Sequence, residues 1–88
     1  MKFLKTKRYS ADARRLALLG RGAIEKLEKL IEEIDEDPRK GTGNPEQLQS
    51  YKPSVVLSRR ILGKHRLVYE LADDCVMLLS CFGHYNDH

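Results

Sequence analysis

The feature that most constrains the fold is a change of hydrophobic periodicity on either side of Pro38. Ahead of it, apolar residues recur at the three- and four-residue intervals that place side chains on one face of a helix. Proline disfavours a helical conformation in the residue before it, so this helix should end ahead of Pro38. From residue 55 onward the chain is instead rich in β-branched and aromatic residues, which favour strands. The helical stripe consists of Ile24, Leu27, Leu30, Ile31 and Ile34.

The other elements are predicted from turn residues and local patterns. Residues 1–5 should form a short strand, and Ser10 is the predicted N-cap of a first helix that runs to about Leu19. Three strands are expected at 55–61, 66–71 and 75–82, with connections short enough to favour antiparallel hairpins. The predicted fold class is α+β, with an N-terminal strand and two helices packed on one face of a small, mostly antiparallel sheet. A chain of 88 residues supports one small core, so we expect a single domain over residues 1–88.

Composition is that of a soluble globular protein, with 41% hydrophobic and 33% charged residues. No apolar run is long enough to span a bilayer, and the basic N-terminus lacks the apolar stretch of a secretory signal. We therefore expect a cytoplasmic protein with no membrane partner. Cys75 and Cys81 fall in one predicted strand, roughly 20 Å apart, which is beyond the reach of a disulfide. We expect two reduced thiols and no metal site.

Charge is distributed unevenly in the second half of the chain. The segment from Gln47 to Tyr69 has no acidic residue, and His65 adds a potential cation to its basic ones. Such a patch is typical of phosphate-binding surfaces, but a solvated hairpin surface explains it equally well on charge alone. The basic residues are Lys52, Arg59, Arg60, Lys64 and Arg66.

Strand alternation predicts which of these residues share a face. Leu67, Tyr69 and Leu71 should lie on one face of their strand, with Arg66 on the other. In the preceding strand, Arg60 lies opposite the face shared by Leu57, Arg59 and Ile61. Arg60 and Arg66 are therefore candidates for the face that the helices leave open, where two cations would hold a phosphate better than one.

The acidic run at 32–37 lies at the C-terminal end of the second helix, where the helix dipole disfavours acids. This local misfit indicates either a solvated face or a role outside the fold.

Four motifs in order resemble the Txe/YoeB toxins of the RelE/ParE superfamily. They are residues 41–48, 58–61 and 65–69 and the pair His84-Tyr85. The resemblance is strong over residues 38–85 and weaker over 1–37. It implies a RelE-like fold and the toxin of a type II toxin-antitoxin system. It also implies an endoribonuclease, an mRNA interferase that cleaves messenger RNA on the translating ribosome without a metal or cofactor. The implied partners are the ribosome, mRNA and a YefM/Phd-like antitoxin with an acidic, partly disordered segment; a homodimer is a further possibility.

The resemblance also implies roles for individual residues. Glu46 resembles the general base, His84 the general acid, and Arg66 the cation that stabilises the transition state. Tyr85 resembles the residue that helps to place the substrate, and Arg60 a second arginine of the active-site floor. The remaining basic residues Arg59, Lys52 and Lys64 are the expected RNA contacts.

The residues present suit this chemistry. Cleavage by the RNA's own 2′-hydroxyl needs a base, an acid and positive charge around the phosphorus. Glu46 is the only acid between Lys40 and Tyr69, and a histidine such as His84 can supply a proton near neutral pH. Each has an ordinary alternative: Glu46 as a loop acid in an ion pair, His84 as a solvated near-terminal histidine, and Tyr85 as a core or surface ring. The occurrence of all four motifs in the family's order favours the catalytic interpretation.

Two departures from the family pattern affect this interpretation. Gln49 and Ser50 stand where related toxins often have a basic residue, which puts one phosphate contact in doubt or shifts it to Lys52. The chain also continues past the usual His-Tyr end with residues 86–88. The alternative functions are a ParE-like, gyrase-directed toxin of the same fold and a non-catalytic RNA-binding module. A metal-dependent nuclease is disfavoured because no carboxylate cluster accompanies the basic patch.

Overall fold

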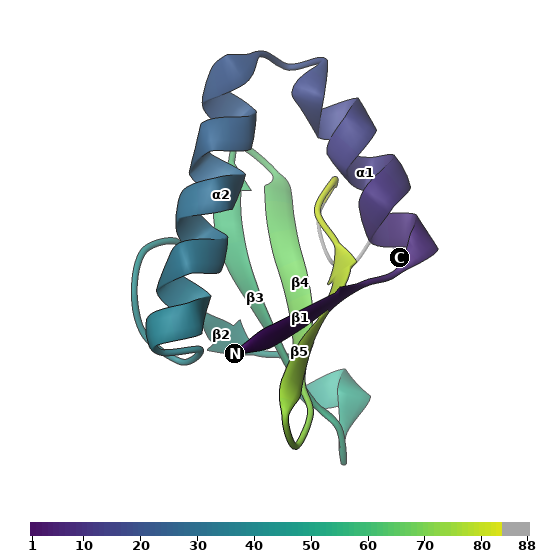
Figure 1. Cartoon of the computed structure of the whole chain (residues 1–88), viewed down its shortest axis with the longest axis vertical. Helices are drawn as coiled ribbons and strands as arrows, with labels where there is room; N and C mark the ends of the chain where they lie inside the picture. Colours follow the sequence, from purple (N-terminus) through teal and green to yellow (C-terminus); the bar gives the residue numbers. More distant parts are fainter. Residues whose placement is uncertain (84–88) are drawn as a thin grey trace.

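The computed structural model describes residues 1–83 of the chain. Within them, two α-helices and a short 3₁₀ helix accompany five strands (Figure 1). In chain order these are β1 (Lys2–Lys5), α1 (Lys7–Ala17), α2 (Arg21–Glu36), β2 (Glu46–Gln47), the 3₁₀ helix η1 (Gln49–Tyr51), β3 (Val55–Leu62), β4 (His65–Leu71) and β5 (Cys75–Ser80).

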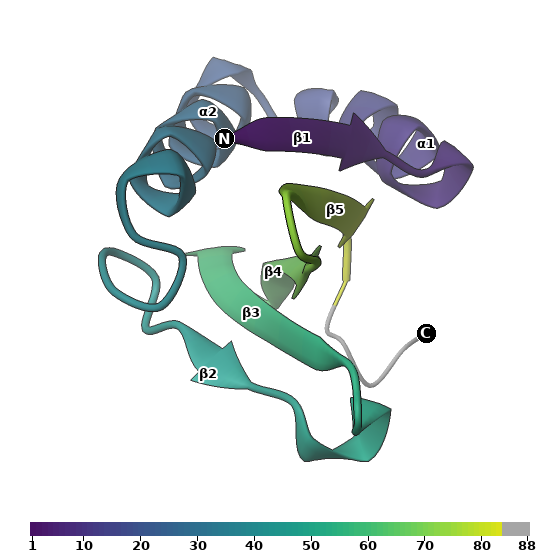
Figure 2. The same ribbon diagram turned by 60° about the horizontal axis from the view of Figure 1, so that its bottom comes forward.

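The strands form one sheet in the order β1-β5-β4-β3-β2. β1 runs parallel to β5, and every other neighbouring pair in this sheet is antiparallel. The two α-helices form a hairpin that lies on one side of β3, β4 and β5 (Figure 2). The predicted α+β class, with two helices on one face of a mostly antiparallel sheet, is therefore confirmed.

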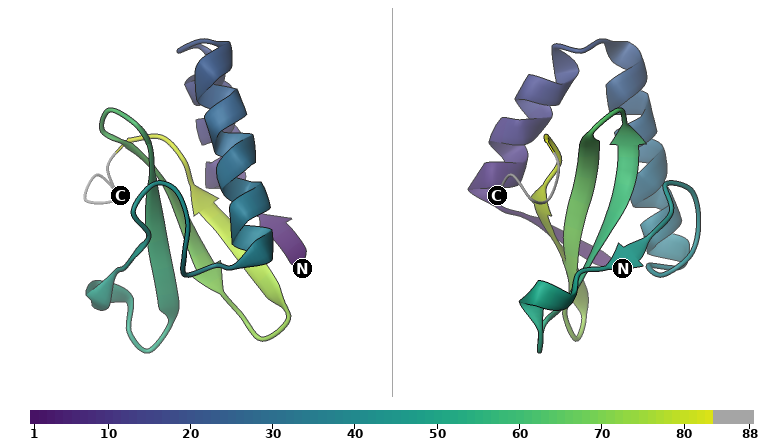
Figure 3. Two further views of the ribbon diagram at one scale, coloured as in Figure 1. Left: turned by 90° about the vertical axis from the view of Figure 1, so that its left-hand side faces the viewer. Right: turned by 180° about the vertical axis from the view of Figure 1, so that it is seen from behind.

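The main core lies between the helices and the sheet. The apolar stripe of α2 supplies Leu27, Leu30 and Ile34, which pack with Leu67 and Tyr69 of β4. A smaller cluster of Leu48, Val56 and Val68, with Leu79 against it, is separate from this core. Val68 alternates with Leu67 and Tyr69 along β4, so the small cluster lies on the opposite face of the sheet. Seen from that side, β3 and β4 are not covered by α1 or α2 (Figure 3, right). We call this side the open face.

The first helix begins earlier than its local sequence indicates. Its N-cap is Thr6, not the predicted Ser10, and it ends at Ala17. The Thr6 hydroxyl accepts a hydrogen bond from the Tyr9 N–H at 3.0 Å and donates to the carbonyl oxygen of Leu79 at 2.9 Å. The helix start is thus tied to β5, more than 70 positions away along the chain. The prediction was wrong because this long-range bond selects Thr6.

Two further sequence predictions can be compared with the fold. Cys75 is half-buried and Cys81 is buried, and both are free thiols, as predicted from their separation. Within residues 1–83, no helix is both long and apolar enough to cross a membrane.

Candidate active site on the open face of the sheet

Glu46 and Arg66 meet across the open face from two strands that flank β3. Glu46 begins β2 and lies opposite Ser58 of β3, whereas Arg66 is the second residue of β4. The Glu46 Oε1 atom lies 3.7 Å from Arg66 Nη2. The carboxylate is about half exposed, at 46%, while the arginine side chain is buried, at 8%. The pair therefore combines a fixed cation with an acid that solvent or a ligand can reach.

Ser58 holds the Arg66 guanidinium in place. Arg66 Nε donates to the Ser58 hydroxyl at 3.0 Å, and Nη2 donates to the Ser58 carbonyl oxygen at 3.4 Å. Both contacts are buried, which removes rotamer freedom from a long side chain before any substrate binds. Ser58 was not among the functional residues predicted from the sequence. Its signal was present, since alternation places Ser58 on the same face as Arg60.

The predicted facing of the two arginines is confirmed. Arg60 and Arg66 are direct cross-strand partners in the β3–β4 pairing, so their side chains leave the sheet on the same face. Arg60 is exposed, and with Lys26 and Asn44 it helps to line a shallow pocket of about 340 Å³. It is therefore a cation accessible from solvent beside the buried one.

The structure corrects the prediction that Arg59 contacts RNA. Its side chain is 0% exposed and points to the helix side of the sheet. There it donates to the Tyr69 hydroxyl at 3.0 Å and forms an ion pair with Glu33 at 3.3 Å. Alternation along β3 turns Arg59 inward with Leu57 and Ile61, so its charge serves the interior and does not face the open surface.

Glu33 gives the acidic run of α2 a structural role. Its carboxylate accepts hydrogen bonds from the Thr42 N–H at 2.6 Å and the Thr42 hydroxyl at 2.9 Å. These bonds, joined by the charges of Arg59 and Lys29, lower the pKa of Glu33 below its usual 4.5. Glu33 and Arg59 thus anchor the loop that leads from α2 to Glu46. For this acid, neither a merely solvated face nor a role outside the fold applies.

The two lysines predicted to contact RNA, Lys52 and Lys64, are exposed but lie far apart. Lys52 precedes β3, whereas Lys64 follows it in the turn to β4. β3 is 8 residues long, which separates its ends by roughly 25 Å. The fold therefore does not gather them into one phosphate site; they could contact only different parts of an extended chain.

His84 and Tyr85, like the tail at 86–88, lie outside the described residues. The segment that leads to them is described as far as Gly83. The Arg66 N–H donates to the Gly83 carbonyl oxygen at 3.1 Å. The residue before His84 is therefore hydrogen-bonded to the backbone of the residue that pairs with Glu46.

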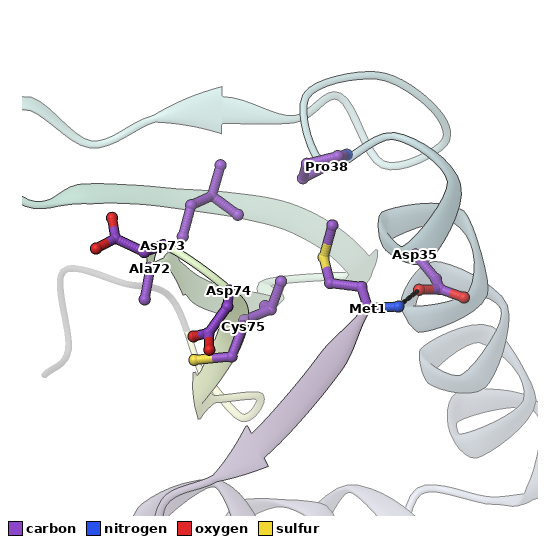
Figure 4. A pocket seen from close by; sticks show the side chains of 9 residues that line it. Met1, Asp35, Pro38, Ala72, Asp73, Asp74 and Cys75 are labelled. Atoms are coloured by element: carbon purple, nitrogen blue, oxygen red, sulfur yellow. Dashed lines mark ion pairs between the residues drawn. The ribbon is translucent and has the colours of Figure 1, made fainter.

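Two pockets are relevant to ligand binding, one beside Glu46 and one away from it. A pocket of about 320 Å³ beside Glu46 is lined also by Gln47, Leu48, Gln49 and Ser50. The two polar residues that replace the usual basic position therefore lie next to the carboxylate. A larger pocket of about 460 Å³ lies between Met1, the end of α2 and the β4–β5 turn (Figure 4). Its charged groups are Asp73, Asp74 and the Met1 amino group, which pairs with Asp35 at 2.9 Å, and none of them belongs to the site described above.

Among residues 1–83, no three His, Cys, Asp or Glu side chains gather as ligands of one metal ion would. The polar groups described on the open face are instead suited to binding and charge stabilisation of a phosphate next to a carboxylate.

Comparisons with known proteins show the family and the fold of the chain. Residues 7–85 match the YoeB-like toxin of bacterial type II toxin-antitoxin systems. Toxin RelK of Mycobacterium tuberculosis is 45% identical over 65 residues, which cover 74% of this chain and 75% of that toxin. A YoeB/ParE toxin from Agrobacterium tumefaciens has the same fold with a TM-score of 0.87 at 29% identity, over 97% of this chain and 100% of that one.

YoeB of Staphylococcus aureus is similar as well. Its dimer matches with a TM-score of 0.84 at 29% identity, over 97% of this chain and 98% of that one. The same toxin in a heterotetrameric complex with the antitoxin YefM matches with a TM-score of 0.79 at 28% identity, with the same coverage of both chains. The match over residues 7–85, together with these relatives, shows that the chain belongs to the YoeB-like toxins of bacterial type II toxin-antitoxin systems.

Proposed function

We propose that this toxin is an endoribonuclease that cleaves messenger RNA on the translating ribosome, without a metal, by attack of the RNA's own 2′-hydroxyl. The observation that carries the proposal is the pairing of an accessible carboxylate, Glu46, with a preorganised guanidinium, Arg66, 3.7 Å away on the open face. A base and a cation at that spacing can act on one phosphodiester together. Translated mRNA as the substrate places the reaction in the cytoplasm.

Each residue has one task in this mechanism. Glu46 takes the proton from the 2′-hydroxyl, whose oxygen attacks the phosphorus. Arg66 stabilises the negative charge that develops on the phosphoryl oxygens, and Arg60 adds a second cation. His84 gives a proton to the departing 5′-oxygen. The products are a 2′,3′-cyclic phosphate and a free 5′-hydroxyl. Tyr85 stacks against a base near the scissile bond.

The ion pair of Glu46 and Arg66 also explains why the base should be inactive in the free toxin. Before RNA binds, Glu46 and Arg66 neutralise each other. A phosphate that binds Arg66 competes with Glu46 for the guanidinium, so the carboxylate is released toward the 2′-hydroxyl only when substrate is in place. Arg66 keeps its contacts with Ser58 during this exchange.

The ribosome supplies the positioning that so small a surface lacks. Holding two reactants in the correct geometry lowers a barrier by several kcal/mol, up to about 7–11 kcal/mol in the best cases. The pocket beside Glu46, about 320 Å³ and lined by residues 46–50, offers few groups to hold a flexible RNA. An mRNA held in the decoding site of the ribosome is already extended and fixed.

The test compares the same mRNA free and on programmed ribosomes in single-turnover reactions, with the 5′ ends of the products mapped. We expect fast cleavage on ribosomes, slow cleavage of naked RNA, and no effect of EDTA on the naked-RNA reaction. Glu46→Gln should abolish most of the ribosomal activity. Equal rates on both substrates would contradict ribosome dependence. An absence of cleavage combined with inhibition of DNA supercoiling by gyrase would favour the ParE-like alternative.

The proposed partner is an antitoxin with an acidic, partly disordered segment that folds over the open face. The S. aureus relative forms a complex with YefM, and Arg60 here offers an exposed cation to such a segment. We expect the product of an adjacent small reading frame to co-purify with the toxin and to inhibit cleavage. The S. aureus toxin also forms a dimer, and a homodimer is the proposed state of this toxin when the antitoxin is absent.

A further inference from the structure

The end of the described chain is fastened to the fold by hydrogen bonds to its backbone. The Cys81 N–H donates to Asp12 Oδ2 of α1 at 3.1 Å. The Gly83 N–H donates to His65 Nδ1 at 2.9 Å, and the Gly83 carbonyl oxygen accepts from the Arg66 N–H at 3.1 Å. Two successive residues of β4 therefore hold both polar groups of Gly83. His84 is the next residue in the sequence.

The ring of His65 is buried, and among the described residues its hydrogen-bond partner is the Gly83 N–H. The ring is 8% exposed and lies against the Phe82 ring, with 4.3 Å between the ring centres and 40° between the planes. The guanidinium of Arg15, from α1, lies 4.3 Å from the centre of the Phe82 ring. Apolar and cationic neighbours of this kind do not attract a proton to the imidazole.

The hydrogen bond fixes the protonation state of His65. A ring nitrogen that accepts from an N–H must carry a lone pair, so the single proton of the neutral ring is on Nε2. Burial lowers the pKa of His65 below its usual 6.5, and the charges of Lys64 and Arg15 lower it further. The ring is therefore neutral at pH 7 and available as an acceptor.

We propose that His65 is a positioning residue for RNA cleavage, because its Nδ1 accepts the Gly83 N–H and so holds in place the residue that precedes His84. The inference rests on the proposed function, in which His84 is the general acid. Arg66 completes the arrangement, since its backbone N–H holds the other side of Gly83 while its guanidinium faces Glu46. β4 thus supplies the cation that pairs with Glu46 and the two groups that hold Gly83, the residue before His84.

Two substitutions of His65 separate the effect of its hydrogen bond to Gly83 from the effect of its ring contact with Phe82. In His65→Asn, the amide oxygen can take the place of Nδ1, but the ring contact with Phe82 is lost. In His65→Phe, the ring contact is kept, but the Gly83 N–H loses its acceptor. A residue that only fills space should tolerate Phe better than Asn. A positioning acceptor should show the reverse order.

The experiment measures single-turnover cleavage at saturating toxin on programmed ribosomes, together with the affinity for ribosomes. A displacement of about 1 Å in a catalytic group can cost about 10²-fold in rate. We therefore expect His65→Phe to lower the cleavage rate by about 10- to 100-fold with unchanged affinity, and His65→Asn to recover most of that loss. Thermal unfolding of both variants establishes that each is folded at the assay temperature.

A second comparison uses His84→Ala as the background. If His65 acts through His84, His65→Phe should cause no further loss in that background, whereas a general structural defect would be additive. The two hypotheses fail differently. His84→Ala at the wild-type rate would overturn the proposed function. If His84→Ala is slow, three results would overturn only the positioning role. These are a wild-type rate for His65→Phe, equal losses for His65→Phe and His65→Asn, and additive losses in the double variant.

Discussion

The Arg59 guanidinium and the Glu33 carboxylate form an ion pair that joins β3 to the last turns of α2, with 3.3 Å between Nη1 and Oε1. The same guanidinium donates to the carbonyl oxygens of Asp37 at 3.0 Å and Lys40 at 2.8 Å. These carbonyls lie just past the end of α2, beyond the reach of the hydrogen bonds within the helix. An interior cation therefore anchors the loop that delivers Glu46 to the open face.

This anchor predicts a large difference between two adjacent arginines. Arg59→Met should lower the free energy of unfolding by about 3 kcal/mol or more, because Glu33 and the carbonyl oxygens of Asp37 and Lys40 lose their buried partner. Arg60→Met is the matched control, and its exposed side chain should change stability by no more than about 0.5 kcal/mol. Urea unfolding of the two variants measures both values. Similar losses for both would mean that the interior contacts of Arg59 contribute little.

The lowered pKa of Glu33 predicts a pH dependence of stability. A carboxyl whose pKa is lower in the folded state contributes stability at pH values above its unfolded pKa, here about 4.5, and that contribution disappears as the pH falls through the folded value. Glu33→Gln should therefore be less stable than the wild type at pH 7, and the difference should shrink between about pH 5 and pH 3. Urea midpoints across this range measure the effect. Glu32→Gln, one position away and exposed, should follow the wild-type curve.

The geometry of Arg66 predicts that charge alone will not replace it. Arg66→Lys keeps a cation but loses the fork that contacts Ser58 and faces Glu46 at the same time. We expect Arg66→Ala to lower the single-turnover cleavage rate by about 10²–10⁴-fold and Arg66→Lys to restore only part of it. Ribosome affinity should change little in either variant. Full activity of Arg66→Lys would show that a simple positive charge is sufficient.

The separation of Lys52 and Lys64 predicts independent, additive effects on association. Each should neutralise one phosphate, so each alanine variant should weaken ribosome binding and reduce the slope of log affinity against log salt by about 0.7–0.9. The double variant should show the sum, because the two lysines lie beyond opposite ends of β3. Lys5→Ala, at the far edge of the sheet, should leave the slope unchanged. A salt slope that is unaffected in the double variant would remove both lysines from the RNA surface.

The burial of Cys81 predicts protection from alkylation. Burial and the nearby charge of Asp12 raise the pKa of the Cys81 thiol to about 12. The thiolate is the reactive form, so iodoacetamide at pH 8 should modify Cys81 at least about 10³-fold more slowly than an unfolded thiol. Single-cysteine variants allow each site to be followed by mass spectrometry, with half-buried Cys75 as the comparison. In denaturant the two should react at similar rates. Rapid modification of native Cys81 would show that the end of β5 opens readily.

Much of the fold could be predicted because it depends on local repeats. The stripe of α2 and the end of that helix before Pro38 follow from spacing and from proline geometry. Alternation placed Arg60 and Arg66 on one face, and the structure pairs them directly. Alternation also placed Arg59 with Leu57 and Ile61, so the sequence contained the signal that this arginine turns inward. The interpretation of the whole basic patch as an RNA surface overrode that signal.

The sequence by itself therefore determined the family and the face on which each strand residue lies, because side-chain direction follows from the backbone repeat. Tertiary structure alone decided which distant groups meet. Glu33 and Arg59 are 26 positions apart, His65 and Gly83 are 18 apart, and Thr6 and Leu78 are 72 apart. The periodicity of helices and strands in the sequence does not predict such pairs, because they form only when elements from different parts of the chain pack together. The buried charge of Arg59, the neutral ring of His65 and the early start of α1 all follow from that packing.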